Sequence, residues 1–489
     1  MNDQFDELTK GFAQSVTRRG ALKKLGIGLA GIALVALFAV PAHAADLYAD
    51  ASVTVNGDGT AARPYWRITD AVARARLLRR TAAIPLSERI IIHVAPGAYL
   101  GSKENSVLNQ NPRYEPLPIL LNVPNLTLAG ATVLTLDARG LPTGVVPVTE
   151  TLLKTVDHTG SFGDSLILIS RTTDGGIGND VTVSGLRLDQ PDALHNGTGI
   201  FVDRVSNFRI EGNVITHAFA GLTTQNASGT IEGNLTFDNL GPGLGYITGG
   251  SAALSAKLVI TRNRAVNNEG GLMLTAVAFG YQPHIAGNDL EIVSQQATFD
   301  RDDLPETLLP TVVNNDLSDN RGFGVRLVCA PLANYLSYDP KHGIQGDLVA
   351  TLRNNSINGN GHYGVSVDSA FVLRSNKRPD ALSFAGTFQG NQLLGNGRTG
   401  FLFSFTYIGV AFADKVASDY FKYLQNSTFT ITDLDGEAAG FDYLNPATDP
   451  LDGTVLNNTL IVNGTVIPNG TKVSPRTPQT TKTNTKGKL

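Results

Sequence analysis

The chain has 489 residues, a single cysteine, Cys329, and a formal net charge of −4, so it cannot form an intramolecular disulfide. Residues 1–44 carry five Lys/Arg and three Asp/Glu, and the segment from Thr471 onward carries five Lys/Arg and no acid. The body between them therefore has 29 cations and 40 acids, a net charge of −11. This acidic balance argues against a nucleic-acid partner.

Residues 1–44 are expected to be an export signal. Arg18-Arg19 precede an apolar run, Leu25–Val40, and a small-x-small cleavage site ends at Ala44. The pattern resembles a twin-arginine signal, but Ala21 stands where a large apolar residue often sits, so the ordinary secretory route stays open. Sixteen apolar residues are short for a membrane span of about 20, which favours cleavage over a membrane anchor. Mass spectrometry of the exported protein would reveal residues 25–40 if this expectation is wrong.

Residues 45–118 are predicted to form an N-terminal cap and the first strands. A helix is expected from Thr69 to Leu78, because Ala71, Val72 and Ala75 recur on one of its faces. An apolar strand, Ile90–Val94, follows it. An amphipathic helix at this place would cover the exposed first coil of a repeat array.

The rest of the chain is organised by a phrase that recurs from Val181 to about Thr465, in which a small or polar residue is followed by Asn and an apolar run. The Asn residues of its nine occurrences are Asn213, Asn234, Asn263, Asn288, Asn315, Asn355, Asn391, Asn426 and Asn458. Their spacing of roughly 20–40 residues predicts a solenoid or propeller. Stacked coils would place each Asn about 4.8 Å from the next in a hydrogen-bonded ladder, and Asn or Gly would tolerate the left-handed backbone of the corner.

A second phrase lies between the Asn phrases and consists of Gly followed by alternating residues. Examples are Gly199-Ile200-Phe201-Val202, Gly324-Val325-Arg326-Leu327 and Gly364-Val365-Ser366-Val367. Each coil therefore contains at least two short strands of period two, separated by turns. The apolar residue directly after each Gly is expected in the core, and the next one is expected to point outward.

Together these phrases resemble the repeats of the right-handed parallel β-helix, or pectin-lyase-like, superfamily. A Gly-Asp-Gly loop at 57–59 and a Val94-x-Pro-Gly-x-Tyr99 turn resemble the N-terminal cap module of secreted β-helix proteins. The resemblance implies an all-β fold, a right-handed parallel β-helix with an N-terminal helical cap. The expected organisation is a signal peptide at 1–44, the cap at 45–118, coils at 119–470 and a disordered basic tail at 471–489.

Function in a repeat protein is expected where insertions interrupt the repeats. Three consecutive coils carry long insertions after the Gly strand, predicted as loops at 329–346, 369–383 and 404–424. They would form an aromatic and charged wall suited to stacking on sugar rings. The alternative is a satellite core of aromatic side chains beneath the loops. The candidate substrate-binding residues of this wall are Tyr338, Lys341, Phe371, Arg374, Lys377 and Tyr407.

Two outward-pointing strand residues beside these loops, Arg326 and Asp368, are the candidate catalytic pair. They lie diagonally on adjacent coils, and a carboxylate next to a cation could act as base and charge stabiliser. A surface ion pair would explain them equally well. The sequence lacks the signature motifs of polygalacturonase-like hydrolases, pectate lyases and mannuronan epimerases. It also lacks a metal-spaced His/Cys cluster, so no cofactor is expected, and no motif supports Ca²⁺.

Two hypotheses remain. The first is an exported enzyme, a lyase or glycoside hydrolase, that binds and cleaves an extracellular polysaccharide. The second is a non-catalytic β-helix protein that binds glycan or presents a surface. Both place the protein in the periplasm, on the cell surface or outside the cell, with no membrane contact after signal cleavage.

Overall fold

The fold is described from a computed structural model. It describes residues 46–103, 111–156, 165–170, 180–190, 197–225, 227–249, 252–277, 305–329, 347–373, 383–411, 421–423, 427–432, 440–444, 447–448, 453 and 455–474. The chain divides into a unit that ends at Asp46 and a compact unit, Leu47–Leu489, and the second contains the fold. No helix among the described residues is long and apolar enough to cross a membrane.

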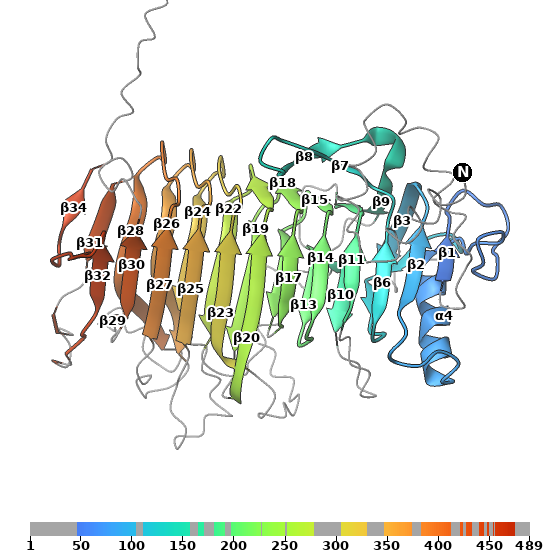
Figure 1. The fold of residues 1–489 in the computed structure, drawn as a ribbon, viewed down its shortest axis with the longest axis horizontal. Helices are drawn as coiled ribbons and strands as arrows, with labels where there is room; N and C mark the ends of the chain where they lie inside the picture. The colour runs from blue at the N-terminus through green and yellow to red at the C-terminus, as the bar shows by residue number, and fades with distance from the viewer. Residues whose placement is uncertain are drawn as a thin grey trace, which may run out of the picture. The chain divides into compact units, whose positions relative to one another are not determined.

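The unit is a right-handed parallel β-helix, as the sequence predicts, and its coils stack along the horizontal direction of Figure 1. The coils form three sheets, which we call the first, second and third sheets in the order in which the chain visits them; after β21 the coils continue the second sheet only through isolated bridges at Asp316, Ser356 and Gln392. The first sheet contains β1 (Asp46–Ala49), β2 (Ile90–Val94), β6 (Leu126–Ala129), β11 (Thr182–Ser184), β14 (Phe208–Glu211), β17 (Gly229–Glu232), β20 (Ala252–Thr261), β23 (Pro305–Val313), β25 (Asp347–Arg353), β27 (Ser383–Gln389), β30 (Thr428–Thr432), β32 (Thr459–Val462) and β33 (Thr465–Val466).

The second sheet is built from short strands and the third from longer ones. The second contains β3 (Gly97–Lys103), β4 (Glu115–Leu117), β9 (Thr151–Thr155), β12 (Arg187–Asp189), β15 (Val214–Thr216), β18 (Leu235–Phe237) and β21 (Arg264–Val266). The third contains β5 (Ile119–Leu121), β10 (Ser165–Ser170), β13 (Thr198–Asp203), β16 (Ala220–Gln225), β19 (Pro242–Gly249), β22 (Gly270–Val277), β24 (Phe323–Cys329), β26 (Tyr363–Leu373), β28 (Thr399–Ala411), β29 (Phe421–Tyr423), β31 (Phe441–Leu444) and β34 (Lys472–Val473).

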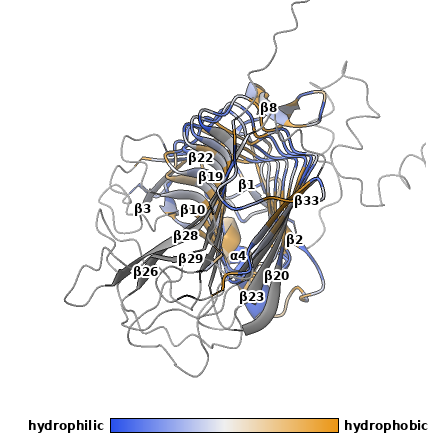
Figure 2. Cartoon of the chain, turned by 90° about the vertical axis from the view of Figure 1, so that its left-hand side faces the viewer, coloured by the Kyte–Doolittle hydropathy of each residue, from blue (hydrophilic) through white to orange (hydrophobic). Residues whose placement is uncertain are grey.

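The core lies between the three sheets and is filled by one inward row from each. In one coil these are Ile210, Ile215 and Leu222, each 0% exposed. The row that follows the Gly phrase is buried as predicted, including Val325 and Val365. Figure 2, which looks along the stack, shows the coils superposed, so that equivalent residues cover one another from coil to coil.

The predicted Asn ladder is present at the corner between the first and second sheets. Asn234 Nδ2 donates to Asn263 Oδ1 (2.9 Å), and Asn263 Nδ2 donates to Asn315 Oδ1 (3.1 Å). Two predicted rungs, Asn288 and Asn426, lie outside the described residues. Asn263 bonds directly to Asn315. Near the end of the ladder the Ser427 N–H donates to Asn458 Oδ1 (2.8 Å).

A second Asn ladder, which the sequence analysis missed, runs along the corner between the second and third sheets. Asn239 Nδ2 donates to Asn268 Oδ1 (2.8 Å), and Asn320 Nδ2 donates to Asn360 Oδ1 (3.1 Å). Each rung lies five residues after a rung of the first ladder, because the segment between the two corners has the same length in each coil, either as a three-residue strand or, in the later coils, around an isolated bridge. That fixed spacing is the sequence signal: 234/239, 263/268, 315/320, 355/360 and 391/396.

The left-handed backbone expected at the corners is present and lies one residue before each ladder Asn. Gly233 (φ 63°), Asn314 (φ 57°) and Asn354 (φ 53°) take this conformation with little or no strain. Arg262 (φ 55°) adopts it at the Asn263 rung, where the surrounding hydrogen bonds must hold the backbone against its preference. The side chain of the ladder Asn is therefore free to bond along the stack.

Helix α4 (Ile68–Arg80) covers the start of the stack, as predicted, and buries Ile68, Ala71, Val72 and Ala75. The N-cap residue, Arg67, makes no side-chain capping bond. A side chain distant in the sequence, Glu115, caps the helix N-terminus instead. Glu115 Oε1 accepts from the Ile68 N–H (2.5 Å), and Oε2 accepts from the N–H (3.1 Å) and the hydroxyl (2.8 Å) of Thr69. Burial raises the pKa of Glu115 to about 7, although these hydrogen bonds and Arg67 act in the opposite direction.

Because the pKa of Glu115 is raised in the folded protein, we expect the free energy of unfolding to depend on pH. The folded protein keeps a proton on Glu115 where the unfolded chain, with a pKa of 4.5, has lost it, so the contribution is present below pH 4.5 and is lost as the pH rises through about 7. Relative to E115Q, the free energy of unfolding of the wild type should fall by on the order of 3 kcal/mol across this interval. Urea unfolding at several pH values checks this, and a difference that is constant with pH would contradict it.

A hairpin lies outside the stack, against the outer face of the second sheet. It consists of β7 (Leu134–Leu136) and β8 (Pro142–Val145), which pair antiparallel, and a 3₁₀ turn, η2 (Pro147–Thr149), follows. We call residues 134–149 the strap.

Candidate functional site

The structure places the predicted catalytic pair on neighbouring strands of the third sheet. Arg326 lies in β24 and is in register with Ser366 of β26, while Asp368 is in register with Val328. The two residues are therefore diagonal, two positions apart along adjacent strands, as the sequence predicts. Arg326 is half-buried and points away from the core row of Val325 and Leu327. The side chain of Asp368 lies outside the described residues.

The predicted wall residues divide into two groups. Phe371 lies within β26 and Tyr407 within β28, because these strands continue to Leu373 and Ala411. The expectation that loops begin at 369 and 404 is wrong, since the parallel pairing of the two strands extends beyond the coil. Tyr338, Lys341, Arg374 and Lys377 lie outside the described residues. The strands that carry the three insertions, β24, β26 and β28, are direct neighbours and end at one edge of the third sheet.

The outer face of the third sheet carries a row of aligned side chains on these coils. Register aligns Met273, Arg326, Ser366 and Leu402 in one row across β22, β24, β26 and β28. Arg326 is the charged member of that row. Its guanidinium carbon lies 5.8 Å from the centre of the Phe323 ring, at the start of the same strand. Arg326 and Phe323 therefore make a cation–aromatic contact.

A second aromatic–cation pair repeats this arrangement on the next two coils. Arg398 Nη1 donates to the Tyr363 hydroxyl (3.2 Å), and its guanidinium carbon lies 5.7 Å from the centre of the Tyr363 ring. Exposed His362 meets the edge of the same ring, 6.5 Å between centres. We call Phe323, Arg326, Tyr363, Arg398 and His362 the aromatic–cation corner.

The sequence analysis did not select four of these five residues, although a signal was present. Each strand-opening Gly of these coils is preceded by a cation or His and, in two cases, by an aromatic residue. The phrases are Arg321-Gly322-Phe323-Gly324, Gly361-His362-Tyr363-Gly364 and Gly397-Arg398-Thr399-Gly400. These phrases precede the strands, whereas the predicted site was built on the insertions that follow them.

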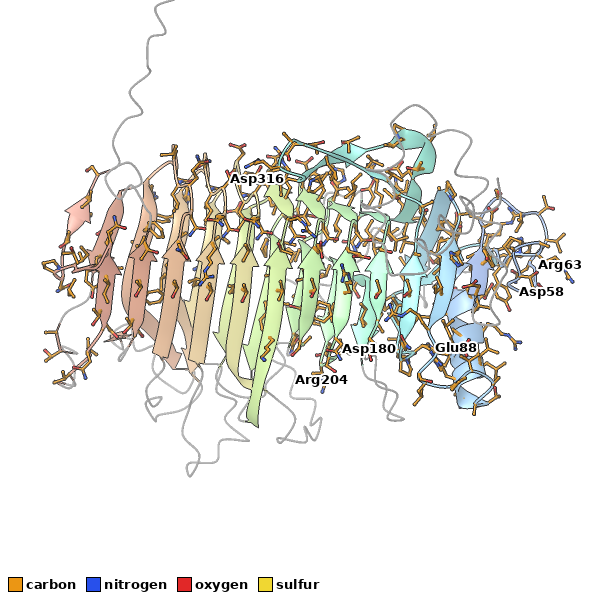
Figure 3. All side chains as sticks on the ribbon, viewed as in Figure 1. Asp58, Arg63, Glu88, Asp180, Arg204 and Asp316 are labelled. Carbon is orange, nitrogen blue, oxygen red and sulfur yellow. The ribbon has the colours of Figure 1, made fainter. Side chains whose placement is uncertain are left out.

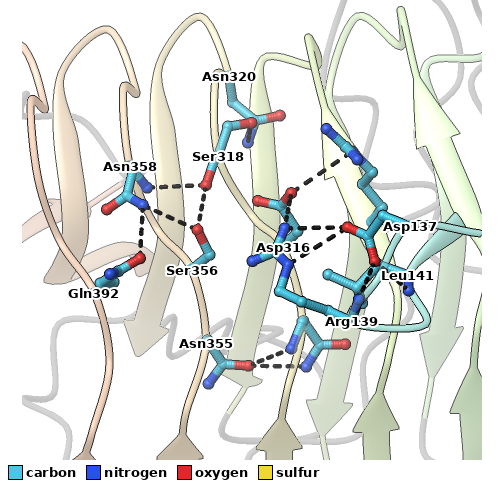
Figure 4. Close-up of polar contacts among 12 residues, drawn as sticks. Asp137, Arg139, Leu141, Asp316, Ser318, Asn320, Asn355, Ser356, Asn358 and Gln392 are labelled. Atoms are coloured by element: carbon cyan, nitrogen blue, oxygen red, sulfur yellow. Dashed lines mark hydrogen bonds and ion pairs between the residues drawn. The ribbon is translucent and has the colours of Figure 1, made fainter. Parts of the chain in front are cut away.

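A separate charge cluster, also missed, holds the tip of the strap (Figures 3 and 4). Arg139 Nη2 lies 3.3 Å from Asp316 Oδ2, and Arg264 Nε lies 3.6 Å from the same oxygen. Asp316 is 4% exposed, and its Oδ1 has no hydrogen-bond partner among the described residues. Burial raises the pKa of Asp137 in the strap turn, but the N–H groups of Leu141 and Arg139, with the Arg139 charge, bring it below its ordinary value.

A chain of polar contacts crosses the second sheet near the root of the strap. Arg187 Nη1 bonds to Glu150 Oε1 (2.6 Å), and its Nη2 lies 3.9 Å from Asp189 Oδ2. Asp189 Oδ1 in turn bonds to His217 Nδ1 (2.9 Å). No three His, Cys, Asp or Glu side chains of the described part form a metal-binding group. The cluster is therefore a charge network, and it orients Arg187 toward the strap.

Comparison with known proteins agrees with the fold. Residues 172–403 match the family described as "Right handed beta helix region". No curated protein matches the sequence.

Several solved structures are similar at low identity. A protein of Geobacillus virus E2, ORF18, is 12% identical with a TM-score of 0.35, and the match covers 67% of this chain and 55% of that one, so this chain spans about half its length. An exopolygalacturonase from Thermotoga maritima is 10% identical with a TM-score of 0.40 (83% and 91% covered). The Dettilon tailspike protein is 10% identical with a TM-score of 0.34 (86% and 59% covered). Such distant similarity carries no argument about activity, which must rest on the side chains of this chain.

Proposed function

We propose that the protein is exported and binds an extracellular polysaccharide along the outer face of the third sheet. The observation that carries the proposal is the aromatic–cation corner, in which Arg326 stands by Phe323 and Arg398 by Tyr363 on three successive coils. Coils repeat at about 4.8 Å, so these groups line a track parallel to the stack. Aromatic rings present apolar faces to sugar rings, and guanidinium groups donate to hydroxyl or carboxylate oxygens.

The insertions complete this groove in the proposal. They leave β24, β26 and β28 at the edge opposite the aromatic–cation corner, so a ligand on the outer face of the sheet would lie between the two. Tyr338, Lys341, Arg374 and Lys377, together with Phe371 and Tyr407, would form the second wall. A groove bounded on both sides gives a long glycan one direction in which to lie, along the stack.

Cleavage is a separate question from binding. In the enzymatic form of the proposal, Asp368 takes a proton from the substrate and Arg326 stabilises the developing negative charge, as a lyase or hydrolase would require. In the alternative form the same face binds glycan without chemistry. The absence of the signature catalytic motifs from the sequence favours the alternative.

Binding is tested with a panel of neutral and acidic polysaccharides and the mature protein, measured by calorimetry. Tyr363→Ala should weaken binding of the best ligand about fivefold, the effect of losing roughly 1 kcal/mol of stacking. Arg326→Gln should weaken it about tenfold or more, because charge-assisted hydrogen bonds are the stronger ones. The matched control is Arg209→Gln, an exposed arginine of the first sheet paired with Glu211 and Glu232, which should change nothing. A panel with no binder, or equal losses in all three variants, would refute the groove.

Catalysis is tested on the same panel by assaying unsaturated products and new reducing ends. If cleavage occurs, Asp368→Asn should abolish it while binding and the melting temperature stay unchanged, since removing one strand carboxylate costs little stability. Product formation that survives Asp368→Asn would remove Asp368 from the mechanism. No product with any substrate would leave the non-catalytic form.

A further inference from the structure

The strap borders a cleft of about 650 Å³ on the outer face of the second sheet. The aromatic–cation corner belongs to other strands, those of the third sheet. The cleft has as its floor one face of four consecutive strands, β12, β15, β18 and β21. Ligand pockets in proteins have volumes of roughly 300–1,000 Å³ and are mostly apolar with a few polar groups. The floor of the cleft is lined by Arg187, Val214, Leu235, Phe237, Arg264 and Val266.

The floor is apolar although it faces outward. Ile215 and Thr236 occupy the inward row, so their neighbours Val214 and Leu235 point away from the core. Both are nevertheless almost fully buried, at 1% and 5% exposed, because the strap lies over them. Phe237 and Val266 continue the apolar floor on the same face and remain half-buried. The strap thus creates an apolar chamber outside the core proper.

One arginine stands at each end of this floor. Register places Arg187, Val214, Leu235 and Arg264 in a single outward column, which puts the two arginines three strand spacings, or roughly 14 Å, apart. Arg187 is neutralised by Glu150 at 2.6 Å. Arg264 faces only Asp316, through Nε at 3.6 Å, and among the described residues its two terminal nitrogens have no partner. At this end of the cleft the two terminal nitrogens of Arg264 can therefore donate hydrogen bonds to a negatively charged ligand.

We propose that this cleft binds an aliphatic carboxylate of medium chain length, with its chain against Phe237 and Val266 and its carboxylate on Arg264. An apolar body matches the floor, and a carboxylate supplies the two acceptor oxygens that the planar guanidinium fork prefers. A sugar would leave its hydroxyl groups against aliphatic side chains without partners, which is costly. The site is independent of the polysaccharide groove.

The contacts of Asp316 with Arg139 and Arg264 hold the tip of the strap beside this ligand site. Asp316 Oδ2 is shared between Arg139 of the strap and Arg264 of the cleft. A carboxylate that binds the two terminal nitrogens of Arg264 leaves the contacts of Asp316 Oδ2 with Arg264 Nε and with Arg139 in place, and its chain would also contact the strap over the cleft. Occupation of the cleft should therefore keep the strap closed.

The test is calorimetric titration of the mature protein with octanoate and with 1-octanol, which has the same chain without the charge. Octanoate should bind at one site, at least tenfold more tightly than octanol. Arg264→Gln should remove that preference by weakening octanoate alone, whereas Arg209→Gln and Arg326→Gln should preserve it. Val266→Trp, which fills the cleft, should abolish binding of both ligands, with the melting temperature confirming that the variant folds.

Three results would overturn the proposal. They are the absence of saturable octanoate binding, equal affinities for octanoate and octanol, and an octanoate preference that survives Arg264→Gln. Because Arg326→Gln is included, failure here is distinguishable from failure of the polysaccharide groove. Hydrogen exchange in the strap offers a second readout, since octanoate should slow exchange at residues 134–149 in the wild type and not in Arg264→Gln.

Discussion

Asn263→Ala should lower the free energy of unfolding by about 2–4 kcal/mol, since a buried polar group left without a partner costs about 1–3 kcal/mol. Asn263 is 0% exposed. Its Oδ1 accepts from both the N–H and the Nδ2 of Asn234 (2.9 Å each), and its Nδ2 donates to Ile231 O (2.9 Å) and to Asn315 Oδ1 (3.1 Å). Alanine removes these four bonds and a fifth, from Nδ2 to Thr261 O (3.1 Å), and leaves the Asn234 N–H buried without an acceptor.

Denaturant unfolding measures this loss, and Gln392→Ala is the matched control. Gln392 also belongs to the corner between the first and second sheets, directly after the ladder residue Asn391, but its side chain is exposed. Its Oε1 accepts one long hydrogen bond, 3.4 Å from Asn358 Nδ2. The control should change stability by no more than about 0.5 kcal/mol. Equal losses in the two variants would mean that the ladder contributes nothing specific.

Val325→Asp should have the larger effect, about 4 kcal/mol or more, because it places a carboxylate in the apolar interior without a cation. Val325 is 0% exposed and is in register with Leu272 and Val365, which are also 0% exposed. A carboxylate here would either stay ionised at high cost or take up a proton. The melting temperature should fall markedly, and more at pH 8 than at pH 5, because protonation relieves part of the cost.

Val259→Asp separates burial from the substitution itself. Val259 lies in β20 of the first sheet, 39% exposed, with Thr230 and Thr311 beside it in register. Since its side chain faces solvent, the same change should cost no more than about 1 kcal/mol, the span of strand propensity. A loss at Val259 as large as at Val325 would show that the assigned inward and outward rows are wrong.

The fold could be predicted from the sequence because its determinants are local and repeated. A Gly–apolar alternation sets a strand, an Asn phrase sets a corner, and stacking follows from their recurrence. The positions of the ladder rungs could not be predicted from the local phrase alone. The Gly287-Asn288 phrase has the local form of a rung, but whether a phrase joins the ladder depends on which strands pair, and β20 pairs directly with β23.

The candidate site could be predicted only in part, for a different reason. Arg326 and Asp368 were found because strand alternation fixes their relative positions from sequence alone. The pairing of Arg139 with Asp316 joins residues 177 positions apart through a hairpin that no repeat specifies. Likewise, the cleft exists because outward-facing Val214 and Leu235 are covered by the strap, which local patterning cannot indicate.

The central claim, that a polysaccharide lies along the outer face of the third sheet, is tested most directly by hydrogen–deuterium exchange with and without the best ligand of the panel. Binding should slow exchange in β24 (Phe323–Cys329), β26 (Tyr363–Leu373) and β28 (Thr399–Ala411), and leave the first sheet and the strap unchanged. Protection confined to the first sheet or to residues 134–149, with these three strands unaffected, would contradict the claim.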